Sequence, residues 1–146
     1  DRFSPWSKGI LVGKCERLCR FNCVQTTPGA RVAPQQGAGL FVFAANPESA
    51  NSERFAQWLA GEHLARMAAV PGVLCARAFR TPDSAPGSSS HRYVATFHTE
   101  TTDVFQSEAW TAAWEGAGMR QELPRAGDTL CLTLRRYIRR RDTIEQ

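Results

Sequence analysis

The amino-acid sequence predicts one α+β domain in which four strands and two helices follow the order β-α-β-β-α-β. The chain has 146 residues, 42% of them hydrophobic and 22% charged, which suits a single globular domain. From Gly39 onward, short runs of strand-forming residues alternate with two stretches that have helical spacing. Turn residues separate these runs, so their order along the chain can be assigned.

The first strand and the first helix lie between residues 40 and 72. Residues 40–44 form a short apolar run rich in strand formers, which predicts a strand. Asn46 and Pro47 then suit an N-cap and a first helical residue. Pro71 and Gly72 end the helix. A four-residue spacing predicts its buried face, which comprises Phe55, Leu59, His63 and Met67, with Trp58 alongside.

The second half of the domain repeats this alternation. Residues 73–80 predict a second strand, residues 81–90 a loop, and residues 91–98 a third strand. Asp103 is expected to cap the second helix, and residues 129–138 to form the last strand. One face of the third strand should carry His91, Tyr93, Ala95 and Phe97. The second helix should pack through Phe105, Ala109, Ala112 and Ala113, with Trp110 and Trp114 beside them.

This order of elements is the ferredoxin-like arrangement. It places the helices on one face of an antiparallel sheet and leaves the other face bare. A second copy of the same sheet is the usual cover. We therefore expect a homodimer in which two sheets pack face to face, a dimeric α+β barrel.

The positive charge of the chain lies at its two ends. Residues 1–38 carry a net charge of +4, residues 39–134 carry −3, and residues 135–146 carry +3. A nucleic-acid-binding domain would carry a basic stripe on its folded face, so we expect no nucleic-acid partner. We interpret residues 1–38 as an extension of uncertain structure, helical in part over residues 14–21. Residues 39–138 are interpreted as the barrel domain, and residues 139–146 as a basic tail.

The cysteines favour a reduced, cytoplasmic setting without a disulfide framework. Cys15, Cys19 and Cys23 are four residues apart and would lie along one helix face, where they either bind a soft metal or pack. A zinc site would need a second pair of ligands, so we expect no metal site. Cys75 and Cys131 stand alone in apolar stretches, as small core residues do. No apolar run approaches the roughly 18 residues of a membrane span, so no membrane partner is expected.

Four segments resemble the small bacterial EthD-like proteins of the dimeric α+β barrel superfamily. The strongest is WLAGEHLARMAAVPGVLCARAFR at 58–80, which is similar to the signature W-x-x-x-E-H-L-x-x-x-x-x-V-P-G-x-x-x-A-x-R-F. The others are RYVATFHTE at 92–100, SEAW at 107–110 and RRYI at 135–138. The resemblance implies a homodimer in which each subunit keeps a pocket between its sheet and its helices. Relatives include cofactor-free polyketide cyclases, decarboxylases, isomerases and monooxygenases, and haem-handling proteins.

His63 is the candidate acid/base residue of such a pocket. It lies on the helix face that points toward the sheet, and the resemblance aligns it with a helix histidine at the pocket. An ordinary imidazole pKa of about 6.5 suits proton transfer near neutral pH. Tyr93 is the second candidate, as a hydrogen-bond donor to a carbonyl or phenolate. The residues expected to contact a substrate are Phe41, Phe43, Trp58, Leu59, Met67, His91, Phe97 and Trp110.

Two functions of different kinds follow from this pattern. The first is an enzyme without a cofactor that cyclises, decarboxylates or isomerises a hydrophobic, polyketide-like substrate with His63 as acid or base. The second is a non-catalytic dimer that binds a small apolar ligand or acts as an accessory subunit, in which Tyr93 and Phe97 fill the core or the interface. A haem-dependent or oxygen-dependent monooxygenase is a third alternative, which only a lone histidine favours.

Overall fold

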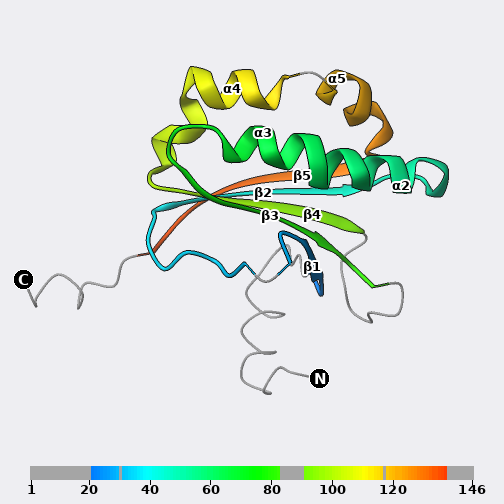
Figure 1. The fold of residues 1–146 in the computed structure, drawn as a ribbon, viewed down its shortest axis with the longest axis horizontal. Helices are drawn as coiled ribbons and strands as arrows, with labels where there is room; N and C mark the ends of the chain where they lie inside the picture. The colour runs from blue at the N-terminus through cyan, green and yellow to red at the C-terminus, as the bar shows by residue number, and fades with distance from the viewer. Residues whose placement is uncertain (1–20, 30, 83–90, 117, 138–146) are drawn as a thin grey trace, which may run out of the picture.

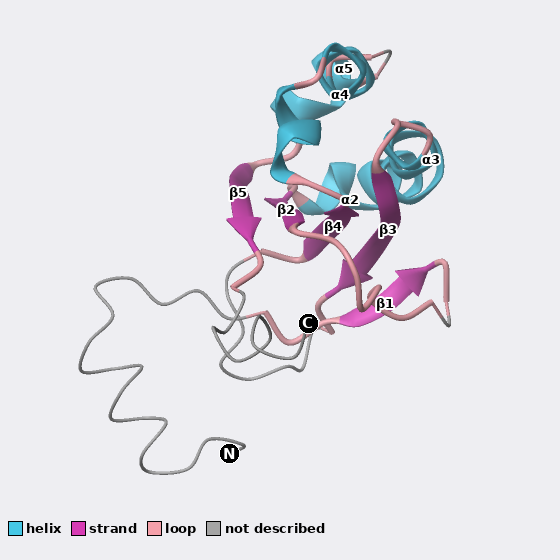
Figure 2. Cartoon of the chain, turned by 90° about the vertical axis from the view of Figure 1, so that its left-hand side faces the viewer, coloured by secondary structure: helices cyan, strands magenta, loops and turns pink. Residues whose placement is uncertain are grey.

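The fold is a five-stranded antiparallel sheet, and the helices of the described residues lie on one of its faces (Figures 1 and 2). The computed structural model describes residues 21–29, 31–82, 91–116 and 118–137. The strands are β1 (Val24–Thr27), β2 (Gly39–Asn46), β3 (Val73–Arg80), β4 (Tyr93–Thr99) and β5 (Asp128–Arg135). Their order in the sheet is β1-β3-β4-β2-β5. The predicted α+β, ferredoxin-like class is confirmed, because β2 to β5 and their helices follow the order β-α-β-β-α-β.

One long helical stretch follows β2 and a series of short helices follows β4. The first consists of α2 (Ser49–Trp58), a π-helical turn (Leu59–His63) and α3 (Leu64–Ala68), without a break. The second consists of a 3₁₀ turn (Thr102–Gln106), α4 (Glu108–Trp114), α5 (Met119–Glu122) and a 3₁₀ turn (Leu123–Arg125). In the described ranges, no helix has the length and apolar character that crossing a membrane requires.

Both helix starts lie later in the chain than the sequence predicts. Asn46 is the last residue of β2, where its N–H donates to the carbonyl of Ala126 at 3.0 Å, and α2 begins after Glu48. Asp103 lies within a 3₁₀ turn, and Ser107 caps α4 by accepting from the N–H of Trp110 at 3.2 Å. Both residue types suit an N-cap, but Asn46 is part of β2 and Asp103 is part of a 3₁₀ turn, so neither is free to cap the α-helix that follows.

The segment before Gly39 contributes to the sheet. β1 pairs with β3 at the sheet edge (Figure 1), and Phe21 and Cys23 pack against Val42, Ala44 and Val94 on the face away from the helices. We call this the outer face. Part of the face that was expected to be bare is therefore covered by the chain itself. The helix expected over 14–21, most of the 81–90 loop and the 139–146 tail lie outside the described residues, as do Cys15 and Cys19.

Two strand boundaries and one cysteine differ from prediction. β4 begins at Tyr93 rather than residue 91, and β5 ends at Arg135. Cys75 is buried as expected, whereas Cys131 is exposed because β5 is an edge strand with one unpaired side.

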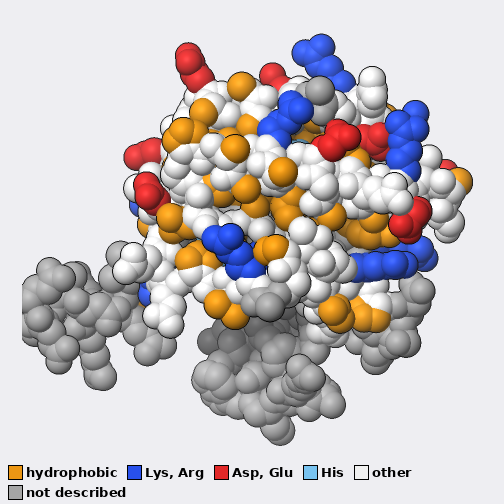
Figure 3. All heavy atoms as spheres, in the orientation of Figure 1, with side chains coloured by type: hydrophobic (Ala, Val, Ile, Leu, Met, Phe, Trp, Pro, Cys, Tyr) orange, Lys and Arg blue, Asp and Glu red, His pale blue; other side chains and the backbone are white. Residues whose placement is uncertain are grey.

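Charged side chains of both signs are scattered over the helical layer (Figure 3).

The register of the sheet decides which side chains face the helices. Phe41 pairs with Phe97, Phe43 with Ala95, and Ala45 with Tyr93, and these residues belong to the main core between sheet and helices. Alternate residues of the same strands, including Leu40, Val42, Thr96 and His98, face outward. The sheet thus presents an aromatic inner face to the helices and a mixed outer face.

Candidate functional site

His63 is the last residue of the π turn and lies deep between the helices and the sheet. Its side chain is 3% exposed, and the predicted helix face of Phe55, Leu59, His63 and Met67 is buried at every position. On an α-helix, residues four apart drift by about 40° per step around the axis. The wider i→i+5 turn at Leu59–His63 offsets part of this drift, so the stripe keeps facing the sheet. Such π turns are frequent at functional sites.

Aromatic rings from four elements surround His63. The indole of Trp58 stacks on the imidazole, with ring centroids 4.8 Å apart and an interplanar angle of 25°. The rings of Trp114, Phe97 and Phe43 meet it edge to face at 5.1, 6.1 and 6.4 Å. We call these five residues the His63 cluster. The topology thus brings together residues from positions 43 to 114 that are distant along the chain.

The environment of His63 keeps the imidazole neutral. Burial, with a smaller contribution from the charge of Arg66, lowers its pKa from 6.5 to about 4. Its Nε2 is buried and has no hydrogen-bond partner, and the same holds for Nε1 of Trp58. Two stacked rings therefore each carry an unpartnered polar atom in an apolar surrounding. This is the chemical feature that most clearly distinguishes the site from ordinary core packing.

Three more of the predicted contact residues lie in the same core. Phe41 contacts the rings of Trp110 and Trp114 at 5.3 and 5.2 Å, and Trp110 contacts Phe97 at 5.8 Å. Met67 is fully buried in the same core cluster. Trp114 was expected only to pack, yet it contacts both Phe43 and His63. Its four-residue spacing from Trp110 was the available signal, since both then lie on one helix face.

Tyr93 lines a cavity between the first helical stretch and the sheet. The cavity has a volume of about 250 Å³, and its walls include Leu59, Gln57, Arg80 and Tyr93. The Tyr93 hydroxyl and Ser52 Oγ are 2.7 Å apart, and the Arg80 guanidinium lies over the Tyr93 ring at 5.9 Å. The described residues that line this cavity include Leu59, at the start of the π turn, but not His63, at its end.

His91 lies apart from Tyr93 and from the His63 cluster. Its ring meets Phe21 at 6.0 Å, and its Nε2 is 3.4 Å from Oδ2 of Asp128. The strand alternation that would have placed His91 beside Tyr93 does not reach it, because β4 begins two residues later. Among the described residues, no three His, Cys, Asp or Glu side chains are grouped so that they could hold a metal ion.

Comparisons with known proteins give matches among solved structures alone. No protein-family model and no curated protein matches the chain. One similar solved structure is that of a variant of SnoaB, a cofactor-independent oxygenase from Streptomyces nogalater. It is 20% identical, the match covers 70% of this chain and 93% of that chain, and the TM-score is 0.48. The EthD-like resemblance of the sequence stays a prediction.

Proposed function

We propose that this protein binds a small aromatic or apolar molecule between its helices and its sheet and moves a proton on it through His63. The observation that carries this proposal is the unpartnered, buried Nε2 of a neutral imidazole inside an aromatic cluster. Leaving a buried polar atom without a partner costs about 1–3 kcal/mol. A ligand hydroxyl or carbonyl would satisfy Nε2 of His63, and the nearby indole N–H of Trp58 could donate to the same molecule.

The cavity at Leu59 and Tyr93 is the proposed entrance. Its 250 Å³ is slightly below the roughly 300–1,000 Å³ of typical ligand pockets, so a bicyclic or tricyclic ligand would need side chains to move. Leu59 is the first residue of the π turn and His63 is the last. A change in the backbone of this turn would join the cavity to the His63 cluster. Once inside, a flat ligand would meet the faces and edges of the surrounding rings.

The low pKa of His63 restricts the chemistry. A base of pKa about 4 is weak, so it serves a substrate whose conjugate base is well stabilised, such as a carbon between a carbonyl and an aromatic ring. The hydroxyl of Tyr93 would then donate to the enolate or phenolate oxygen. Cyclisation, decarboxylation and isomerisation of polyketide-like substrates all begin or end with such a proton transfer, and none needs a cofactor.

Non-catalytic binding is the second candidate. The rings around His63 contact the imidazole directly, which favours a closed core in which His63 packs and does not react. In this alternative Tyr93 and Phe97 stabilise the fold and the cavity only binds.

Solvent exchange distinguishes the two candidates. We would incubate the protein in D₂O with 2-tetralone and anthrone, two ketones with an acidic carbon beside an aromatic ring, and measure deuterium uptake by mass spectrometry. Catalysis predicts exchange faster than in buffer alone. Quenching of tryptophan fluorescence by the same ketones without faster exchange would overturn the enzyme proposal in favour of binding. If the ketones neither quench the fluorescence nor exchange faster, both candidate functions are contradicted.

We further propose that the functional unit is a homodimer formed through the outer face of β5. Leu132 and Leu134 are 36% and 44% exposed there, beyond the area that Phe21 and Cys23 cover. Sedimentation velocity at micromolar concentration should show a dimer for the natural chain and a monomer for Leu132→Asp. Thr133→Asp, on the opposite face of the same strand, is the matched control and should stay dimeric. A monomeric natural chain would refute the homodimer.

A further inference from the structure

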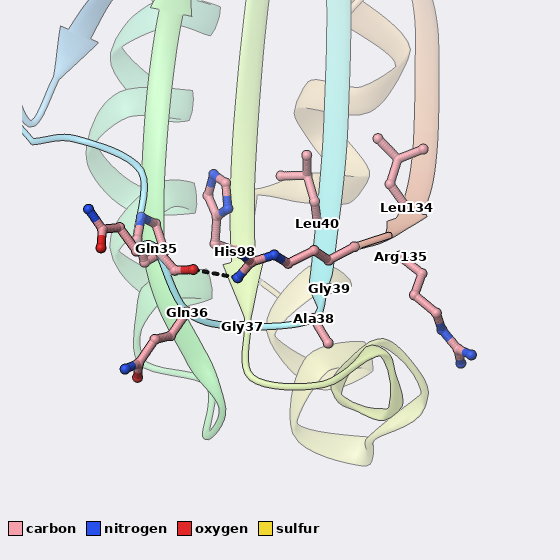
Figure 4. A pocket seen from close by; sticks show the side chains of 11 residues that line it. Gln35, Gln36, Gly37, Ala38, Gly39, Leu40, His98, Leu134 and Arg135 are labelled. Carbon is pink, nitrogen blue, oxygen red and sulfur yellow. Dashed lines mark hydrogen bonds between the residues drawn. The ribbon is translucent and has the colours of Figure 1, made fainter. Parts of the chain in front are cut away.

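A second and larger hollow lies on the outer face, on the opposite side of the sheet from the His63 cluster. It has a volume of about 690 Å³ and is bordered by residues 34–38, by Leu40, His98 and Leu134 of the sheet, and by Arg136 (Figure 4). We call it the outer groove. Figure 4 shows the side chains of Leu40, His98 and Leu134 on the same side of the sheet. Leu40 pairs with both His98 and Leu134, so the three form one row across β4, β2 and β5.

The wall of the outer groove is held in place by the backbone. Ala38 donates its N–H to the carbonyl of Glu100 at 3.0 Å and accepts from the N–H of Arg136 at 2.8 Å. Gly37 has a φ of +105°, and a Cβ there would lie 2.6 Å from the carbonyl oxygen of Thr99. Only glycine permits this close approach. The groove is therefore formed before any ligand arrives.

Two donors lie on the polar side of the outer groove, at His98 and at Arg136. Nη2 of Arg77 lies 3.1 Å from Nε2 of His98. A guanidinium only donates, so Nε2 accepts and the neutral ring carries its proton on Nδ1, as a donor. Burial and the charge of Arg77 lower the pKa of His98, which agrees with a neutral ring. Arg136 uses Nη1 to bond the carbonyl of Gln35, which leaves other N–H groups of its guanidinium for a ligand.

The charge of the outer groove selects the ligand. Among the described residues, those that line the groove include Arg135 and Arg136 and no acidic residue. Arg135 donates from Nη2 to Oγ1 of Thr102 at 3.2 Å, whereas Arg136 donates to the carbonyl of Gln35 in the wall of the groove, so we take Arg136 as the cation available to a ligand. A cation and a neutral donor beside two leucine side chains match a molecule with an anionic head and an apolar tail.

We propose that the outer groove binds a medium-chain organic carboxylate. Its carboxylate would lie between Arg136 and His98, and its alkyl chain along Leu40 and Leu134. The volume of about 690 Å³ is within the range of ligand sites. This site is separate from the His63 cluster, since the two lie on opposite faces of the sheet. It does not depend on the chemistry proposed above for His63, but it shares Leu134 with the proposed dimer face.

Calorimetric titration with decanoate tests the proposal, and decanol serves as the uncharged counterpart. We expect decanoate to bind at least about tenfold more tightly than decanol, and Arg136→Gln to remove that difference. Arg31→Gln is the matched control, because Arg31 likewise donates to a carbonyl, that of Leu74 at 3.2 Å, without lining the groove. Since Leu134 also lies on the proposed dimer face, titrations are run below the concentration at which sedimentation shows a dimer.

Three results would overturn the proposal. The first is equal binding of decanoate and decanol, and the second is equal loss of affinity in Arg136→Gln and Arg31→Gln. The third is loss of decanoate binding in His63→Gln with no loss in Arg136→Gln, which would place decanoate in the interior cavity instead. Retained affinity in His63→Gln together with loss in Arg136→Gln supports the outer groove, whatever the exchange experiment shows for His63.

Discussion

His63→Gln is expected to slow deuterium exchange into the aryl ketones by about 10²–10⁴-fold, the usual loss when a well-placed acid or base is removed. Glutamine keeps a polar group of similar length in the site but cannot take up a proton near neutral pH. Binding of the ketone should persist, because the rings of Trp58, Trp114, Phe43 and Phe97 that surround the site are unchanged. The measurement is the initial rate of deuterium uptake at saturating ketone, with near-ultraviolet circular dichroism as the check of folding.

Two control variants separate chemistry from packing. Leu64→Met changes another buried residue of the same core, outside the expected contact residues, while keeping the imidazole, so its exchange rate should stay close to that of the natural chain. Trp58→Phe keeps an aromatic ring near His63 and removes the unpartnered indole N–H, so it should weaken binding of the ketone more than it slows exchange. A folded His63→Gln protein with an unchanged rate would refute the catalytic assignment.

The second large effect is a loss of stability in acid that depends on His63. The folded protein keeps His63 neutral down to about pH 4, whereas the unfolded chain protonates it below about pH 6.5. Between these values the unfolded state binds the extra proton, so the free energy of unfolding falls as the pH falls. At 1.36 kcal/mol per pH unit the total is about 3 kcal/mol, and it is complete below pH 4.

Urea unfolding at pH 7, 5.5 and 4.5 measures this loss. His63→Phe retains an aromatic ring without a titratable group, so its stability should decline less over the same range. Met67→Leu keeps His63 and should decline as the natural chain does. All three proteins contain the same carboxylates and the same other histidines, so the difference between their pH profiles isolates His63. Parallel pH profiles for the natural chain and His63→Phe would show that the imidazole is already solvated.

The fold class and the buried helix face could be predicted because both depend on short-range repetition. Four-residue spacing placed Phe55, Leu59, His63 and Met67 on one side of a helix, and each is buried. Element boundaries were less accurate, because Asn46, Asp103 and His91 suit the predicted positions locally but take part in other contacts. The pairing of β1 with β3 joins residues more than 50 positions apart, and no local pattern indicates it.

The sequence by itself determined the order of the elements and the side of the first helix on which His63 lies. Only the tertiary structure decided that His63 stacks on Trp58 and meets Trp114, that its Nε2 has no partner, and that its pKa falls to about 4. It likewise decided that residues 34–38 and Arg136 enclose a groove on the other face. Periodicity is set by neighbours along the chain, whereas desolvation and cavity shape are sums over side chains that only folding brings together.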